Sequence, residues 1–280
     1  MSMAFYLGLD GGGTGCRAAL ADARGRVLAG AMGGPANIAT DPAAAIATIR
    51  DTLARMVARA GHPAIAGAGL GIAGVNAAGT AARLRAALPY PGLRIESDAV
   101  TAALGALGAR DGIVAAIGTG SVFARRMGSA FRQIGGRGLV LGDEGSGAAM
   151  GRAALAAALR AEDGHSPLTP FLRALIAERG DSAGVIAFAQ TARPADFAAL
   201  APRILAEADH DPAAAAILAQ ATADIAAAID ILQPGDAPLP VVFLGGLGPA
   251  FRARLAGRWP TRDPQGTALD GALMLARGSA

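Results

Sequence analysis

A glycine-rich stretch near the N-terminus places one carboxylate beside a flexible turn. An apolar run at 5–9 ends on Asp10, and the chain becomes apolar again after residue 15. The turn between the two apolar runs contains Gly11, Gly12, Gly13 and Thr14. Glycines let backbone N–H groups approach phosphate oxygens, and a carboxylate beside a phosphate is favourable mainly when a divalent cation lies between them. The stretch therefore predicts a nucleotide-phosphate and Mg²⁺ site, with a ligand-free hairpin as the alternative.

A second turn of the same kind follows about a hundred residues later. An apolar strand from Ile113 leads into Gly118, Thr119 and Gly120, and a returning strand begins at Ser121. Two such turns predict a duplicated α/β fold in which one phosphate turn from each lobe faces a shared cleft. Coincidence in a sequence rich in alanine and glycine is the alternative.

Four further polar residues lie where they could contact a ligand. Asn37 lies in a loop rich in glycine and proline, Asp98 begins a predicted helix, and Asp143 and Glu144 are adjacent acids in a glycine-rich loop. Each has an ordinary structural alternative: a turn asparagine bonded to its own backbone, a helix N-cap, and a solvated loop, respectively. A strand at 239–244 ends on Gly245 and Gly246, where an adenine or ribose could lie against bare backbone.

The elements that must position these residues alternate between strands and helices. Strands are predicted at 27–32, 66–72, 93–96 and 239–244, and helices at 78–88, 148–160, 249–255 and 267–276. Asp41 followed by Pro42 predicts the start of a helix that reaches about Ala60. The region 166–233 is predicted to be mostly helical and to end in an alanine-rich helix at 212–232.

Composition narrows the function classes. The 280 residues are 52% hydrophobic and 17% charged with 40 glycines, which is typical of a compact globular protein. The arginines are scattered and aromatic residues amount to only 4%, so no nucleic-acid partner is predicted. The sequence contains no lysine, so phosphate charge must be met by Mg²⁺, arginine and backbone N–H groups.

The compartment is predicted from cysteine content and apolar runs. One cysteine, Cys16, excludes a disulfide within the chain. The N-terminus shows no basic segment followed by an apolar signal core, and no apolar run reaches membrane-spanning length without charges or glycines. These features predict a cytoplasmic protein with no membrane partner.

Five motifs in order give the chain a family resemblance that spans nearly its whole length. They are Asp10-Gly11-Gly12-Gly13-Thr14, Glu96-Ser97-Asp98-Ala99, Gly118-Thr119-Gly120-Ser121, Leu141-Gly142-Asp143-Glu144-Gly145-Ser146-Gly147 and Phe243-Leu244-Gly245-Gly246. Together they resemble the actin-like sugar kinase superfamily. The branch it resembles holds N-acetylglucosamine kinases, bacterial glucosamine kinases and the benzoyl-CoA reductase-type ATPase family. Of these motifs, the Leu-Gly-Asp-Glu-Gly-Ser-Gly segment is the most specific.

The resemblance implies a duplicated ribonuclease H-like (actin-like ATPase) α/β fold with two lobes around an ATP cleft. Each lobe is expected to hold a mixed five-stranded sheet. Residues 1–109 would form the N-terminal lobe, which carries the acceptor site and first phosphate turn and is joined by the C-terminal helix 266–280. Residues 110–265 would form the nucleotide-binding C-terminal lobe with a largely helical insertion. Homodimers are common among the proteins that it resembles, which leaves a homodimer open for this chain.

The resemblance also implies roles for individual residues. Asp98 would be the catalytic carboxylate that accepts the proton of a sugar 6-hydroxyl, and Asp10 would orient Mg²⁺ through water. Phosphate contacts would come from Gly11, Gly12, Gly13, Thr14, Gly118, Thr119 and Gly120. Gly245 and Gly246 would flank the adenosine. Asn37, Thr119, Asp143 and Glu144 would join Asp98 in binding the sugar.

The sequence departs from the family pattern at two places. Gly15 and Cys16 stand where relatives commonly have Lys-Thr, which removes a cation near the phosphates. Arg17, Arg125 and Arg126 are candidate replacements, with surface solvation as their alternative role. Arg137 stands where many relatives carry tryptophan.

Three functions remain open at this point. The first is an ATP-dependent kinase that phosphorylates the 6-hydroxyl of a small-molecule amino sugar, with glucosamine slightly preferred over N-acetylglucosamine because of the Gly-Pro-Ala-Asn-Ile loop. The second is a non-kinase ATPase that drives electron transfer in a partner, which a single cysteine disfavours. The third is a regulatory protein on the same fold. A kinase is expected to turn over ATP slowly until the sugar binds.

Overall fold

The structure is a computed structural model that describes residues 4–235 and 237–278. The chain divides into two compact units, each of which is described by itself. Unit 1 consists of Met1–Val114, Ala124–Arg132 and Arg262–Ala280, and unit 2 consists of Ala115–Phe123 and Gln133–Thr261.

The first sheet lies in unit 1 and contains five strands. They are β1 (Phe5–Gly11), β2 (Cys16–Asp22), β3 (Val27–Gly33), β4 (Ile65–Ile72) and β5 (Arg94–Glu96). Their order across the sheet is β3-β2-β1-β4-β5. β1 pairs with β2 antiparallel and with β4 parallel, so the central strand has a hairpin partner on one side and a crossover partner on the other.

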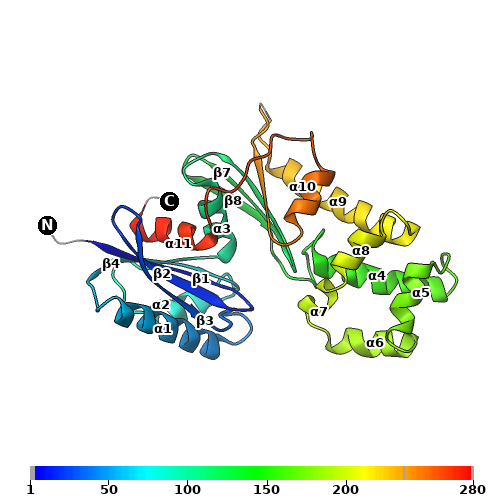
Figure 1. Cartoon of the computed structure of the whole chain (residues 1–280), viewed down its shortest axis with the longest axis horizontal. Helices are drawn as coiled ribbons and strands as arrows, with labels where there is room; N and C mark the ends of the chain where they lie inside the picture. The colour runs from blue at the N-terminus through cyan, green and yellow to red at the C-terminus, as the bar shows by residue number, and fades with distance from the viewer. Residues whose placement is uncertain (1–3, 236, 279–280) are drawn as a thin grey trace. The chain divides into compact units, whose positions relative to one another are not determined.

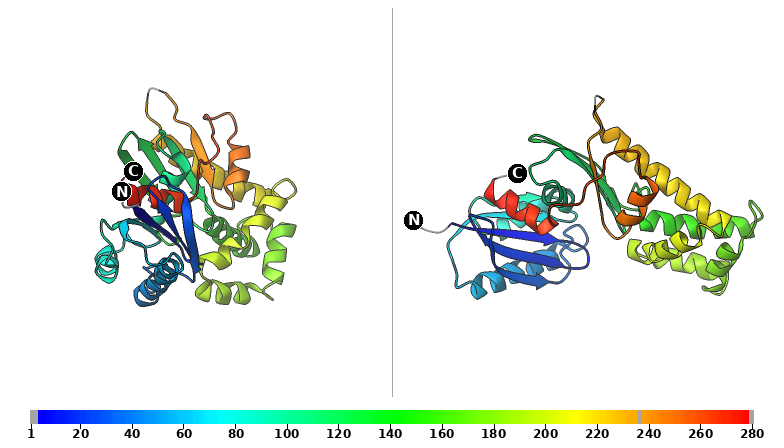
Figure 2. Two further views of the ribbon diagram at one scale, coloured as in Figure 1. Left: turned by 60° about the vertical axis from the view of Figure 1, so that its left-hand side comes forward. Right: turned by 45° about the horizontal axis from the view of Figure 1, so that its top comes forward.

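Helices cover both faces of this sheet (Figures 1 and 2). α1 (Pro42–Arg59) packs against β2 and β3, whereas α11 (Ala268–Arg277) packs against β1, β4 and α3 (Asp98–Leu107). α2 (Thr80–Ala87) is a shorter helix that contacts α1. The buried side chains between the sheet and α1 include Leu9, Leu53 and Leu70.

The start of α1 confirms its predicted cap. The Asp41 carboxylate accepts a hydrogen bond from the Ala44 N–H at 3.0 Å, and Pro42 occupies the first helical position, where a missing N–H costs nothing. α1 therefore begins where the sequence predicts, and its apolar side chains pack in the core.

The second sheet repeats the strand order of the first. Its strands are β6 (Gly112–Ile117), β7 (Ser121–Met127), β8 (Ala130–Gly135) and β9 (Val241–Leu244), in the order β8-β7-β6-β9. This order matches β3-β2-β1-β4 strand for strand, which is what a duplicated half predicts.

One expectation about the second sheet is wrong. Five strands were expected in each lobe, but the second sheet has four among the described residues. At the place that corresponds to β5, the chain makes only an isolated parallel bridge between Val241 and Thr261. β5 itself has only three residues, so the fifth strand is a minor part of either half.

Unit 2 also contains a helical region, as expected. Its helices are α4 (Gly147–Glu162), α5 (Pro170–Ala177), α6 (Ser182–Thr191), α7 (Pro194–Ala198), α8 (Ala201–Glu207), α9 (Pro212–Leu232) and α10 (Gly248–Arg254). α9 has the length and hydropathy of a membrane-spanning helix, but a core helix passes the same test. Ile225 and Ile229 of α9 are fully buried within the protein.

Candidate active site

Asp10 is the second-last residue of β1, and its carboxylate is mostly buried. It lies opposite Arg17 in the β1–β2 register, and one of its oxygens lies 3.2 Å from a guanidinium nitrogen of Arg17. The Asp10 side chain is 17% exposed. Burial raises the pKa of Asp10 above its ordinary value, while the charge and hydrogen bond of Arg17 act in the opposite direction.

Asp98 occupies the first position of α3, and another residue caps that helix. The N-cap is Ser97, whose hydroxyl accepts a hydrogen bond from the Val100 N–H at 3.3 Å. One oxygen of the Asp98 carboxylate accepts the Ala99 N–H at 2.9 Å. The structural alternative for Asp98, a helix N-cap, is therefore wrong, because Ser97 is the N-cap of α3.

The two acids of unit 1 influence each other. Burial raises the pKa of Asp98 above its ordinary value, its hydrogen bond to Ala99 opposes that shift, and the nearby charge of Asp10 adds to it. A carboxylate that is partly desolvated and lies near another negative charge takes up a proton more readily than an exposed carboxylate. A raised pKa is compatible with the general-base role expected for Asp98.

Backbone hydrogen bonds tie the first turn to two neighbouring loops of unit 1. The Gly12 carbonyl accepts the Ala36 N–H and the Gly11 carbonyl accepts the Ala73 N–H, each at 2.8 Å. The Ala73 carbonyl in turn accepts the Ile38 N–H at 3.0 Å. The loop that carries Asn37 is therefore fixed beside the end of β1. The sequence reasoning missed Ala73, although it directly follows a strand parallel to β1 and so lies at the same edge of the sheet.

Asn37 is half-buried in that loop. Its side-chain oxygen accepts the Ala39 N–H at 3.0 Å, which is the local backbone bond named as its structural alternative. This bond fixes the direction of the side chain.

The glycines predicted to contact nucleotide fall into two groups by what surrounds them. A Cβ on Gly13, Gly118 or Gly246 would meet nothing within 4 Å, and one on Gly12 would meet only the Gly15 carbonyl at 3.8 Å. Gly11, Gly120 and Gly245 are instead pressed against protein atoms. Gly12, Gly13, Gly118 and Gly246 therefore leave room for a ligand, whereas the other three are required by packing.

Gly245 shows why packing selects glycine. Its φ is +82°, and a Cβ there would lie 2.3 Å from the Ile117 carbonyl oxygen. Both the backbone conformation and the close approach exclude a larger residue. The end of β9 is thereby held against the end of β6.

The second turn is fixed by the glycine-rich loop that follows it in unit 2. The Ser121 hydroxyl donates to the Glu144 carbonyl at 2.7 Å. The first N–H groups of α4, on Gly147 and Ala148, donate to the carbonyls of Gly118 and Thr119 at 2.9 and 3.1 Å. These bonds leave the Thr119 side chain exposed at the tip of the turn.

Asp143 is a buried part of this arrangement. It is 8% exposed with a φ of +60°, and its carboxylate accepts the Gly138 N–H at 3.2 Å. Burial raises the pKa of Asp143, while backbone N–H bonds from Gly138 and Ser121 act to lower it. The structural alternative for Asp143, a side chain in a solvated loop, is therefore wrong, because the residue is buried.

The adjacent acid has different surroundings. Glu144 is exposed and lines a surface hollow of about 600 Å³ formed by its own loop, α4 and α9. Asp143 instead lies within 2.8 Å of the place where a Cβ of Gly120 would be. The two acids of the motif thus have separate environments.

The arginines considered as substitutes for lysine differ in position. Arg126 is buried and donates to the carbonyls of Gly108 and Gly128 in unit 1. The alternative role of a solvated surface arginine is therefore wrong for Arg126. Arg17 forms an ion pair with a predicted site residue, Asp10.

The carboxylates of the candidate site fit a metal ion that binds together with the phosphates of a nucleotide. No group of three or more His, Cys, Asp or Glu side chains suited to a metal is found among the described residues. Mg²⁺ is commonly held by one or two carboxylates together with substrate phosphates and water. Asp10, partly exposed beside an open turn, fits this mode.

The family of the chain follows from comparison with known proteins. Residues 7–253 match the BadF/BadG/BcrA/BcrD ATPase family, and the chain belongs to that family. The nucleotide of such a family is ATP.

Particular relatives give a finer picture. Glucosamine kinase GspK of Vibrio cholerae serotype O1 is 31% identical over 213 residues, which cover 74% of this chain and 72% of GspK. A crystal structure assigned as an N-acetylglucosamine kinase of Chromobacterium violaceum is 36% identical, covers 98% of this chain and 99% of its own, and has a TM-score of 0.83. Another, from Porphyromonas gingivalis, is 20% identical with a TM-score of 0.71 and covers 99% of both chains, which shows the fold alone. The predicted duplicated ribonuclease H-like fold with two lobes is confirmed.

Proposed function

We propose that this protein is an ATP-dependent kinase that phosphorylates the 6-hydroxyl of an amino sugar, with glucosamine preferred over N-acetylglucosamine. The observation that carries the proposal is the Asp98 carboxylate, which is half-buried at the start of α3, is not needed as the cap because Ser97 caps the helix, and lies within electrostatic reach of Asp10. The identities to a glucosamine kinase and to a structure assigned as an N-acetylglucosamine kinase support an amino sugar as the acceptor.

In the proposed reaction, Asp98 orients the 6-hydroxyl and accepts its proton. The sugar oxygen forms a bond to the γ-phosphorus of ATP, the bond between that phosphorus and the β–γ bridging oxygen breaks, and ADP leaves. Phosphoryl transfer depends mainly on positioning and charge neutralisation, so the proton acceptor acts late. A raised pKa suits Asp98 to hold the proton until the product leaves.

The remaining predicted residues have supporting roles in this proposal. Asp10 would hold Mg²⁺, which neutralises phosphate charge when it is bound. Gly12, Gly13, Thr14, Gly118 and Thr119 would contact phosphates, and Gly246 the adenosine, since these positions are open or exposed. Asn37, Asp143 and Glu144 would contribute to sugar binding. Gly11, Gly120 and Gly245 would act by shaping these turns.

The electron-transfer alternative has no support in the structure. Cys16 is the only cysteine, and its sulfur is buried 3.5 Å from the Thr52 hydroxyl oxygen. A cluster-binding role needs exposed thiolates.

Acceptor specificity tests the proposal. We would measure kcat/KM with glucosamine, N-acetylglucosamine, N-acetylmannosamine and glucose, and locate the phosphate in the product by NMR. The proposal predicts the highest kcat/KM for glucosamine and a 6-phosphate product. A glucose preference, or phosphate at another carbon, would contradict it.

A further inference from the structure

The β1–β2 hairpin carries an ion pair at the edge of the proposed phosphate turn. Asp10 and Arg17 face each other across the two strands, and the turn at 12–15 lies between them in the chain. Arg17 is 57% exposed, whereas Asp10 is 17% exposed, so the guanidinium can leave while the carboxylate stays in place. The pair therefore joins a fixed acid to a movable cation.

Strand alternation places Arg17 on the same face of the sheet as the two acids. Cys16, the preceding residue, points to the other face and lies against Thr52 of α1. Side chains alternate along a strand, so Arg17 points away from α1. The Asp10 carboxylate that it contacts is the one whose charge reaches Asp98 of α3.

The turn has no other cation of its own. Residues 11–16 contain no charged side chain, and the whole chain contains no lysine. The guanidinium fork of arginine binds either a carboxylate or a phosphate, and it prefers paired oxygens in both. A nucleotide phosphate held over Gly12 and Gly13 would compete with Asp10 for Arg17.

We propose that Arg17 is a phosphate-binding residue that pairs with Asp10 in the free protein and moves its guanidinium to a phosphate of the bound nucleotide. The exchange supplies a cation to the turn and exposes the Asp10 carboxylate to the cation that accompanies the nucleotide. This inference rests on nucleotide use in the proposed function but not on the identity of the acceptor.

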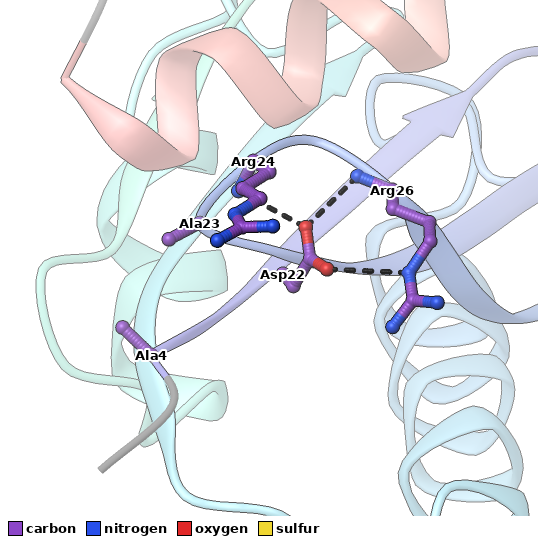
Figure 3. A pocket seen from close by; sticks show the side chains of 5 residues that line it. All are labelled: Ala4, Asp22, Ala23, Arg24 and Arg26. Carbon is purple, nitrogen blue, oxygen red and sulfur yellow. Dashed lines mark hydrogen bonds and ion pairs between the residues drawn. The ribbon is translucent and has the colours of Figure 1, made fainter. Parts of the chain in front are cut away.

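The same unit offers a matched control. Asp22 and Arg26 form a second arginine–aspartate pair at 3.3 Å, with the arginine 75% and the aspartate 13% exposed. Figure 3 shows Asp22 accepting hydrogen bonds from the backbone N–H groups of Arg24 and Arg26 and from the Arg26 side chain. Arg26 resembles Arg17 in exposure and pairing but lies at the β2–β3 turn.

The test measures binding without sugar or turnover. Calorimetric affinities for ATP·Mg²⁺ and for adenosine are compared in the wild type, Arg17→Gln, Arg17→Lys and Arg26→Gln, with thermal unfolding to verify folding. We expect Arg17→Gln to weaken ATP·Mg²⁺ binding about tenfold and to leave adenosine binding unchanged, because only ATP carries the phosphates. Arg17→Lys is expected to restore part of the affinity, and Arg26→Gln to match the wild type.

The outcomes separate this inference from the proposed function. Equal ATP affinity in Arg17→Gln and Arg26→Gln, or an equal loss for ATP and adenosine, would show that Arg17 is only a surface ion pair. The kinase proposal would then still stand on its own tests. A wild type that binds no ATP·Mg²⁺ would overturn both, whereas binding without sugar phosphorylation would overturn only the choice of reaction.

Discussion

The Asp98 carboxyl group lies within electrostatic reach of the Asp10 carboxyl group, and both acids belong to the same compact unit. Burial is the largest cause of the raised pKa of each. Arg17 opposes the shift of Asp10, and backbone hydrogen bonds from the Ala99 N–H and from its own N–H oppose the shift of Asp98. Two partly desolvated acids of like charge near each other cost stability, and such groups with raised pKa values are frequent at functional sites.

Replacing Asp98 by Asn is expected to lower kcat by about 10²- to 10⁴-fold, because the amide cannot accept the proton of the acceptor hydroxyl. ATP binding and thermal stability should stay near the wild-type values, since Ser97 keeps the cap of α3. The measurement is steady-state kinetics together with calorimetric ATP binding.

Ser97→Ala is the control for that experiment. It removes the cap and should lower the free energy of unfolding by about 1 kcal/mol while kcat stays close to normal. If Ser97→Ala reduced kcat as much as Asp98→Asn, the effect would come from the helix end and not from the carboxylate.

Two glycine variants distinguish ligand space from packing. Gly13→Ala adds a methyl group where no atom lies within 4 Å, so stability should change by less than about 0.5 kcal/mol while ATP affinity falls. Gly245→Ala forces a Cβ toward the Ile117 carbonyl at a φ of +82° and should destabilise the protein by more than about 2 kcal/mol. Denaturant unfolding and ATP titration measure the two effects, and a stable Gly245→Ala protein would refute the packing argument.

Asp211 connects two helices of unit 2 and gives a pH-dependent contribution to stability. Its carboxylate accepts hydrogen bonds from the Phe171 N–H, the Thr169 hydroxyl and the Ala213 and Ala214 N–H groups. Desolvation raises the pKa of Asp211, but these bonds together outweigh it and hold the pKa below its ordinary value of 3.8. The stabilisation is therefore fully present above that value and is lost as the pH falls through the lower pKa of the folded state.

We expect Asp211→Ala to lower the free energy of unfolding by about 2 kcal/mol at pH 7, and the difference from the wild type to shrink below pH 3.8. Asp41→Ala is the matched control, because Asp41 also precedes a proline at a helix start but accepts one N–H bond, and about 1 kcal/mol is expected. Urea unfolding at stepwise pH measures both. A constant difference through the acid range would contradict the role given to the Asp211 charge.

Much of the fold could be predicted because its signals are local. Asp41-Pro42 marks a helix start that the structure confirms, the helices predicted from Asp98 and from residue 212 also begin there, and the two Gly-Thr turns indicate the repeated strand order. Strand β8 was missed, because its alternation of side chains is half exposed and it carries no strong apolar run.

The surroundings of the candidate site residues were harder to predict because they depend on contacts far apart in the sequence. The Asp143 carboxylate lies against Gly120 and accepts backbone N–H bonds from Gly138 and Ser121, and no local pattern indicates these contacts. The ion pair of Arg17 likewise depends on strand register. The open or packed surroundings of Gly13 and Gly245 also become visible only in three dimensions.

The most direct test of the proposed function is ADP release from ATP·Mg²⁺ by the wild-type protein with glucosamine, with N-acetylglucosamine and with no sugar, each repeated with Asp98→Asn. The kinase proposal predicts slow release without sugar, strong stimulation by glucosamine and no stimulation in Asp98→Asn. ADP release at one rate regardless of sugar, or undiminished stimulation in Asp98→Asn, would contradict it.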